Sequence, residues 1–246
     1  MKSYFLLPLL ITFLMVACSK IDSEDISQKE IFTDYKVMYD VKNDEVIARA
    51  TFIAKNCSCE KISGLTRVKL SGDSFVTLNG KKLKLDGVID KNISLEYSGR
   101  FKLEEGQKEA ILIYQNNDGE VFQNNFTFLE EPIFKIPPKI VEVGIDNHLE
   151  IEKDSLPIGK SELYFVLKDN KLRTLQSTPV LNSDISSSGE VTFSLKPDPS
   201  KSEKLSEDGE IGLCGSVKRN NIEKPEAGGL LSLSTCGRSS FVRILN

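Results

Sequence analysis

Two cysteines separated by a single residue, Cys57 and Cys59, form the pattern in this sequence with the most potential for chemistry. In an extended strand, side chains two positions apart lie on one face, farther apart than the Cβ–Cβ spacing of about 3.5–4.5 Å that a disulfide requires. A local bend, for which Lys55 and Asn56 are suited, would close this gap. We therefore predict a disulfide for these residues, either local or to a neighbouring strand.

Reduced thiols at the same positions would support a different function. Two thiolates can hold Cu(I) or Zn(II), but tetrahedral zinc needs two further ligands, and the chain has one histidine and no nearby methionine. Thiol exchange of the thioredoxin kind uses C-x-x-C in a βαβ setting, and this sequence has neither. Metal or thiol handling through Cys57 and Cys59 is therefore our alternative hypothesis for function.

The other internal cysteines, Cys214 and Cys236, have a spacing that favours a structural disulfide. In residues 211–217 and 231–236 the apolar side chains occupy odd positions, whereas each cysteine occupies an even one. If the two strands pair, both sulfur atoms leave the apolar face and can meet. The closed loop would stabilise the fold by about 3 kcal/mol on the chain-entropy account. We predict this bond; a bond from either cysteine to the first half of the chain is the alternative.

Catalytic patterns are weak. His148 is the only histidine, and we expect it in an exposed turn over residues 145–149. A Ser-His-Asp triad is recognised by geometry, but neither a G-x-S-x-G elbow nor an H-E-x-x-H motif is present. Carboxylate pairs at 104–105 and 130–131 could serve a glycosidase, yet no tryptophan is available to stack on sugar. We predict no catalytic residue, cofactor or metal; a hydrolase of unknown type is a further alternative.

The N-terminus has the pattern of an export signal. Lys2 precedes an uncharged apolar run at residues 4–17, which is shorter than the roughly 20 residues that cross a bilayer and has no polar face. These features are typical of a secretory signal peptide. The end of the run, Leu14-Met15-Val16-Ala17-Cys18, resembles the lipobox of bacterial lipoproteins, with Met15 in place of the commoner leucine. The resemblance implies cleavage after residue 17 and acylation of Cys18, by diacylglycerol and palmitate.

This resemblance also implies a compartment. Two or more acyl chains hold a protein stably on a membrane that it does not span. Ser19, in place of an aspartate after the cysteine, favours the outer membrane. Removing Cys18 leaves four cysteines, an even number suited to two disulfides in an oxidising compartment. The net charge of −4 is mixed in sign along the chain, with no basic stripe that would predict a nucleic-acid partner.

The elements that must position these residues are strands. Residues 18–31 are polar and charged, which predicts a flexible tether after the lipidated cysteine. Strict alternation of apolar and polar side chains at 46–52 and 93–101 predicts strands with one buried face. Asn79-Gly80 and the run at 116–119 predict hairpin turns, because asparagine and glycine accept a positive φ.

A domain junction is expected at residues 130–138, where three prolines interrupt strand pairing. Alternation returns at 163–167 and 191–195. We therefore predict an all-β chain with two immunoglobulin-like β-sandwich domains in tandem, at 32–131 and 132–246. Because the loops of such domains commonly bind, we expect a non-catalytic binding or structural role, toward a protein or an envelope polymer.

Overall fold

The fold is described by a computed structural model. It covers residues 20–55, 66–86, 95–104, 106–142, 144–152, 162–169, 174–180, 186, 189–194 and 208–245. The signal peptide, Cys18, Cys57 and Cys59 lie outside these ranges, so the predictions for them stay predictions. Regular structure in the described ranges is β-strand, apart from two short 3-10 turns, η1 (Ser23–Asp25) and η2 (Gln28–Glu30). The predicted all-β fold is confirmed.

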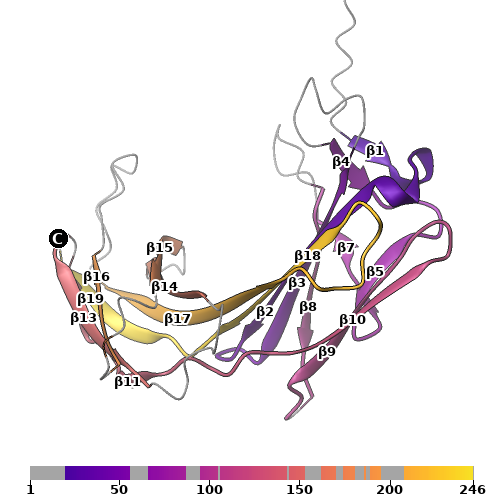
Figure 1. Cartoon of the computed structure of the whole chain (residues 1–246). Coiled ribbons are helices and arrows are strands. Elements are labelled where there is room, and N and C mark those ends of the chain that lie inside the picture. The colour runs from indigo at the N-terminus through magenta and orange to yellow at the C-terminus, as the bar shows by residue number, and fades with distance from the viewer. Residues whose placement is uncertain are drawn as a thin grey trace, which may run out of the picture.

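The N-terminal unit is a sandwich of two sheets (Figure 1). One layer contains β1 (Lys20–Asp22), β2 (Ile31–Asp40), β3 (Glu45–Ala54), β4 (Thr66–Lys69), β7 (Lys84–Leu85), β8 (Tyr97–Lys102) and β18 (Gly229–Cys236). The facing layer contains β5 (Phe75–Leu78), β6 (Lys81–Lys82), β9 (Glu109–Gln115) and β10 (Val121–Thr127). Alternation places one face of each long strand in the core between the layers.

The core of this unit follows the predicted pattern. On β3 the side chains at even positions are fully buried: Val46, Ala48, Ala50 and Phe52. The ring of Phe52 contacts three tyrosines from both layers, Tyr35, Tyr97 and Tyr114. This aromatic cluster explains how a chain without tryptophan fills a large core.

Both predicted hairpin turns are present. Asn79 and Gly80 have φ values of 48° and 74°, and they join β5 to β6 with Leu78 opposite Lys81. Positive φ at both central residues is the signature of a type I′ turn, whose twist matches that of the strands. Gly119, with φ of 79°, occupies the turn between β9 and β10.

The C-terminal unit is a second sandwich. One layer contains β12 (Ile140–Glu142), β14 (Glu162–Asp169), β15 (Thr174–Val180), β17 (Asp208–Arg219) and β19 (Ser240–Leu245). The facing layer contains β11 (Phe134–Ile136), β13 (Asp146–Ile151) and β16 (Glu190–Ser194). Its core includes the alternating side chains Leu163, Phe165 and Leu167, as predicted, and a stack of Phe165 on Phe193.

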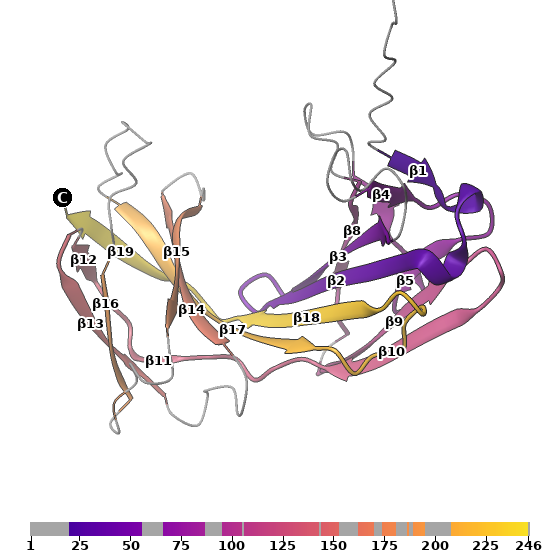
Figure 2. The same ribbon diagram turned by 45° about the horizontal axis from the view of Figure 1, so that its top comes forward.

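Two strands connect the units. β17 contributes Ile211 and Leu213 to the C-terminal core, and its other end places Val217 against the N-terminal core. β18 then pairs in parallel with β2, as Figure 2 shows. Its side chains Leu231 and Leu233 are buried in the N-terminal core. The sequence division at 131/132 therefore separates two clusters of buried side chains, but a strand from the second half completes the first sheet.

The prediction of a flexible tether over residues 18–31 is wrong for residues 20–31. β1 pairs in parallel with β4, and Ile21 and Ile26 pack against the N-terminal core. Ser23 is fully buried; its Oγ accepts hydrogen bonds from the backbone N–H of Ser71 at 2.9 Å and from Nδ2 of Asn117 at 3.0 Å. Polar composition suggested solvation, but these side chains find partners in the loops of the sandwich.

Candidate functional site

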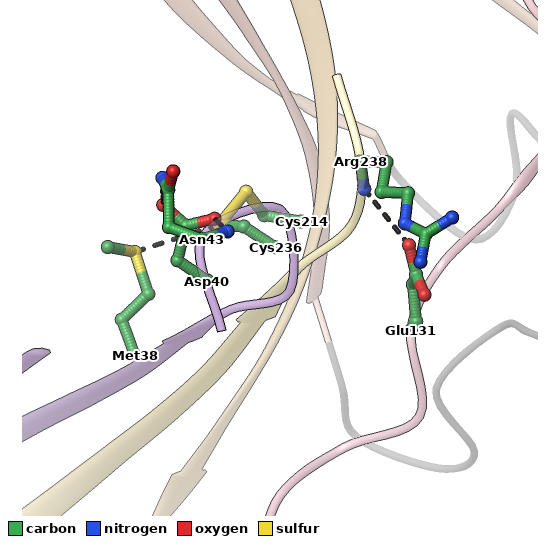
Figure 3. The surroundings of a disulfide bond; sticks show 7 residues. All are labelled: Met38, Asp40, Asn43, Glu131, Cys214, Cys236 and Arg238. Carbon is green, nitrogen blue, oxygen red and sulfur yellow. Dashed lines mark hydrogen bonds between the residues drawn. A yellow bond between two sulfur atoms is a disulfide. The ribbon is translucent and has the colours of Figure 1, made fainter. Parts of the chain in front are cut away.

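The predicted Cys214–Cys236 disulfide is confirmed, and it lies at the seam between the two units. The two cysteines are directly opposed in the antiparallel ladder of β17 and β18, with a Cα–Cα distance of 4.0 Å. Figure 3 shows the bond beside Met38, Asp40 and Asn43, from the end of β2 and the turn that follows. The disulfide therefore ties the end of β18 to the strand that both units share.

The turn at residues 41–44 covers this bond. The backbone N–H of Val41 donates to the carbonyl of Cys236 at 3.0 Å, and Met38 Sδ lies 3.7 Å from Cys236 Sγ. Cys214 is only 2% exposed although it lies off the apolar phase of its strand, as predicted. A disulfide with one buried cysteine and one partly exposed cysteine, paired within a sheet at the seam of two units, is typical of a structural bond.

A charged contact strengthens the same seam. Lys42 Nζ donates to Glu210 Oε2 at 2.7 Å and to Ser239 Oγ at 3.1 Å, and Ser239 Oγ donates to Glu210 Oε2 at 2.6 Å. Burial alone would raise the pKa of Glu210, but the hydrogen bonds from Lys42 and Ser239 hold it below its ordinary value. This cluster therefore joins the turn after β2 to β17 and to the turn before β19.

A second contact closes the opposite side of the seam. Glu131 Oε1 accepts a hydrogen bond of 3.0 Å from the backbone N–H of Arg238, which Figure 3 also shows. Gly237 approaches the carbonyl of Pro132 so closely that a Cβ would overlap it. Residues 131–132, which link the two units, are thus in direct contact with the turn between β18 and β19. This contact leaves no long hinge between the units at these residues.

A groove with basic walls lies at the edge of the N-terminal sandwich. It has a volume of about 570 Å³ and is lined by Lys81, Lys82, Lys84, Ser98, Gly99, Arg100, Phe101 and Lys102. This volume falls in the range of about 300–1,000 Å³ that is typical of ligand sites. Five of the eight lining residues are cationic, in a chain whose net charge is −4.

The groove forms because one segment moves from one layer to the other. β6 pairs with β5 in the facing layer, and β7, only one residue later, pairs with β8 in the larger sheet. Leu83, between them, is 2% exposed, and its N–H donates to the carbonyl of Val76 at 2.9 Å. Because Leu83 points into the core, the flanking Lys82 and Lys84 point outward. The groove is the space between β8 and residues 81–84, which cross from one layer to the other.

The charges in the groove are only partly balanced. Arg100 Nη1 lies 3.7 Å from Glu45 Oε2, which is a loose and exposed pair. Lys81 Nζ lies 5.9 Å from the ring centre of Phe101, at the limit of a cation–π contact. In the part of the chain that the structure describes, no ion pair involves Lys82, Lys84 or Lys102. The groove therefore has an excess of positive charge.

The backbone of β8 is also open toward the groove. The N–H of Asp86 donates to the carbonyl of Glu96 at 2.8 Å, so even-numbered residues of this strand direct their backbone groups toward β7. The ladder between β7 and β8 reaches only Ser98. By the same parity, the N–H and C=O of Arg100 and Lys102 face the groove, beyond the end of that ladder.

These groove residues were missed by the sequence reasoning. Lys81, Lys82 and Lys84 form a short basic run, Arg100 lies on the polar phase of the strand predicted at 93–101, and Lys102 directly follows that strand. The basic run was the available signal. Its meaning depends on the pairing of β7 with β8, which brings two segments with more than a dozen residues between them to one edge.

The other residues considered for chemistry do not form a site. His148 is on β13, which begins at Asp146, and not in the predicted turn. It lies opposite Thr192 of β16. Its side chain is 62% exposed, with Nδ1 3.1 Å from Thr192 Oγ1 and 3.5 Å from Glu190 Oε1. It is an exposed strand histidine in a local polar contact.

The carboxylate pairs also take structural roles where they are described. Glu130 pairs with Lys108 at 3.2 Å, and Glu131 binds the backbone of Arg238. Among the described residues, no three side chains of the metal-binding types gather into a cluster. The described ranges likewise contain no helix with the length and apolar character needed to cross a bilayer.

Comparison with known proteins gives no family. No protein-family model and no curated protein matches the sequence. Among solved structures, tandem immunoglobulin repeats of Dlar match 87% of this chain and 96% of theirs, with 12% identity and a TM-score of 0.34. Immunoglobulin domains 1 and 2 of DIP-gamma match 87% of this chain and 95% of theirs, with 8% identity and a TM-score of 0.21.

A third similar structure is SGBP-B of the Bacteroides ovatus mixed-linkage glucan utilization locus, in complex with a mixed-linkage heptasaccharide. The match covers 81% of this chain and 52% of that chain, with 12% identity and a TM-score of 0.23. These scores are too low to carry a conclusion about function. The two-layered sheets described above establish the sandwich architecture without them.

Proposed function

We propose that this chain is a lipid-anchored protein of the bacterial cell envelope that binds a partner and catalyses no reaction. The binding site that we propose is the basic groove between β6, β7 and β8. Its partner would be an envelope component that carries negative charge, either a protein or a polymer. The outer membrane is the proposed location.

The anchor rests on the sequence. The charged start, the short apolar run and the lipobox-like end at Cys18 support export and acylation. The Cys214–Cys236 bond supports the same compartment, because disulfides persist in oxidising environments. The first strand begins at Lys20, only two positions after Cys18. A lipid on Cys18 would therefore hold the N-terminal sandwich close to the membrane surface.

The observation that carries the binding role is the groove itself. Within the described ranges its five exposed cations have one loose carboxylate partner, Glu45 beside Arg100 at 3.7 Å, whereas Lys42 and Glu210 at the seam are in close contact at 2.7 Å. Five cations gathered along one groove raise the local positive potential and so attract anions. Stability alone does not call for such an arrangement, since like charges repel at short distance.

The anchor is tested by replacing Cys18 with serine in the natural host. We expect Cys18→Ser to lose labelling by radioactive palmitate and to leave the membrane fraction. Ser19→Ala, a neighbouring change that keeps the cysteine, should stay labelled and membrane-bound. Membrane association of the Cys18→Ser variant at the wild-type level would contradict the anchor.

The binding role is tested separately with the purified protein. A fluorescent polyanion, polyglutamate, should bind wild type and lose at least about tenfold in affinity when Lys82 and Lys84 are both changed to glutamate. The matched control changes Lys36 and Lys139, which lie outside the groove, to glutamate, and so alters net charge equally. Equal loss in both variants would show that net charge alone governs binding, against a site in the groove.

A further inference from the structure

We infer that the groove accepts an extended acidic peptide segment of a partner protein, which adds as a strand along the open edge of β8. This inference rests on the proposed binding role of the groove and names its ligand class and mode. In strand addition, backbone hydrogen bonds supply affinity, and pockets for alternate side chains supply specificity. The described residues supply both.

The first requirement is an unpaired edge of sufficient length. β8 runs from Tyr97 to Lys102, and β3 pairs with all of it on one side. On the other side, among the residues that the structure describes, β7 covers only Tyr97 and Ser98. The next residues, 99–102, present their edge to the groove, with the N–H and C=O of Arg100 and Lys102 directed outward. An added strand would lie along β8 in the position that β7 would occupy if it extended beyond Lys84, toward Leu83.

The second requirement is that the groove favours one kind of peptide over others. Lys82 and Lys84 stand on the wall formed by the departing segment, while Arg100 and Lys102 stand on β8. A strand between these walls would have cations on both sides. Acidic side chains at alternate positions would reach them on one face, because successive side chains point to opposite faces of a sheet. A basic strand would be repelled by the same charges.

The third observation concerns the apolar part of the groove. Phe101 is partly buried against the N-terminal core, and its ring lies over Gly99, where a Cβ would overlap it. The ring and the Leu83 side chain fill the space beside the β8 backbone. An alternating peptide would therefore meet an apolar surface on one face and charge on the other. An acidic polysaccharide has no such alternation of apolar and acidic groups.

Lysine on a sheet edge also has a purely protective role, because it discourages edge-to-edge association. Protection explains charges on the open edge, such as those of Arg100 and Lys102. It does not require the facing wall to be basic, and three of the five cations belong to that wall: Lys81, Lys82 and Lys84. The experiment below separates the two roles, because a protected edge binds no strand.

The test measures binding of a labelled eight-residue peptide of alternating glutamate and valine to the purified protein, by fluorescence anisotropy. The same peptide with glutamine for glutamate removes the charge. A version N-methylated at alternate residues keeps the charge and removes the backbone N–H donors along one edge of the peptide. We expect each change to weaken binding by about tenfold or more, because backbone and charge-assisted hydrogen bonds both contribute. The control variant with Lys36→Glu and Lys139→Glu should bind the unmodified peptide as tightly as the wild-type protein does.

Polygalacturonate, an acidic polysaccharide, is the competing probe. If it binds through Lys82 and Lys84 as tightly as the peptide, and N-methylation has no effect, strand addition is refuted while an anion-binding role stands. If no acidic probe binds the groove, both the inference and the proposed binding role fail. Circular dichroism of every variant confirms that the sheets are intact, so that a loss of binding reports on the groove.

Discussion

The two sandwiches of this chain differ in how they obtain their cores. The described core of the C-terminal unit is drawn only from residues between Phe134 and Ile244, all within the second half of the chain. The core of the N-terminal unit draws on residues from Ile31 to Phe128 and then on Leu231 and Leu233, which arrive from the far end of the chain. One unit is therefore self-contained, and the other depends on a returning strand.

This difference shows that a linker rich in proline marks a change of core and not a point where the chain can be divided. β17 belongs to both units, and β18 pairs with β2 over its whole length. The N-terminal unit thus depends on a strand from near the end of the chain, and it carries both the groove and the segment next to Cys18. The seam that positions this strand contains the disulfide and the Lys42–Glu210 pair.

The largest expected effect comes from separating the halves. A fragment ending at residue 131 lacks Leu231 and Leu233 and leaves β2 without its partner strand along residues 33–40. We expect it to aggregate or stay unfolded, because an unpaired hydrophobic edge favours association. The fragment 132–246 should keep a cooperative unfolding transition by circular dichroism. Cooperative folding of the first fragment alone would contradict the dependence.

A smaller change tests the same dependence in the intact chain. Leu233→Ala removes a fully buried side chain and should lower the free energy of unfolding of the N-terminal unit by about 2–5 kcal/mol. Val242→Ala, which is 3% exposed in the other core, is the matched control and should act on the C-terminal unit. Urea titrations followed by tyrosine signals report mainly on the N-terminal unit, because Tyr35, Tyr97 and Tyr114 lie in its core. Equal effects of the two variants on this signal would show that the units unfold together.

Removal of the disulfide should cost somewhat less. Replacing Cys214 and Cys236 with alanine opens a loop with a sequence separation of 22 residues, a loss of about 3 kcal/mol on the chain-entropy account. Because the bond holds the end of β18 at the seam, the N-terminal unit should lose more stability than the C-terminal one. Thermal unfolding of the double variant, with and without a reducing agent, measures this. No change in either transition would rule out a stabilising role.

The smallest effect concerns the charged contact at the seam. The pKa of Glu210 is lowered in the folded state from an ordinary value of 4.5, so the unfolded state takes up its proton first as pH falls. The contact therefore contributes fully above about pH 4.5, and its contribution is lost as pH falls through the folded pKa. Glu210→Gln should remove about 1 kcal/mol at neutral pH, and the loss should become smaller as pH is lowered below 4.5, measured by urea titration. A loss independent of pH would contradict this account.

The sequence predicted local structure well because the signals for it are local. The alternation at Val46–Phe52, the turn at Asn79-Gly80 and the cysteine phases on β17 and β18 each depend on a few neighbouring residues, and the structure confirms them. The order of strands in the sheets was out of reach, because the parallel pairing of β18 with β2 joins residues nearly 200 positions apart. The residues of one strand do not indicate which distant strand it will pair with.

The errors about the tether and the groove have the same cause. Residues 20–31 look solvated because Ser23 and Gln28 are polar, yet their partners, Ser71 and Asn117, lie far along the chain. The groove was missed because a basic run at residues 81–84 becomes a site only opposite β8. Function here depends on contacts between distant segments, which composition does not reveal.

Hydrogen exchange of the whole purified protein, with and without the alternating glutamate–valine peptide, tests the central claim most directly. We predict that the peptide slows exchange in residues 99–103, where the N–H groups of Arg100 and Lys102 face the groove, and leaves the C-terminal unit unchanged. Slower exchange confined to the C-terminal unit, or no change in β8 at saturating peptide, would contradict the assignment of binding to the groove of the N-terminal sandwich.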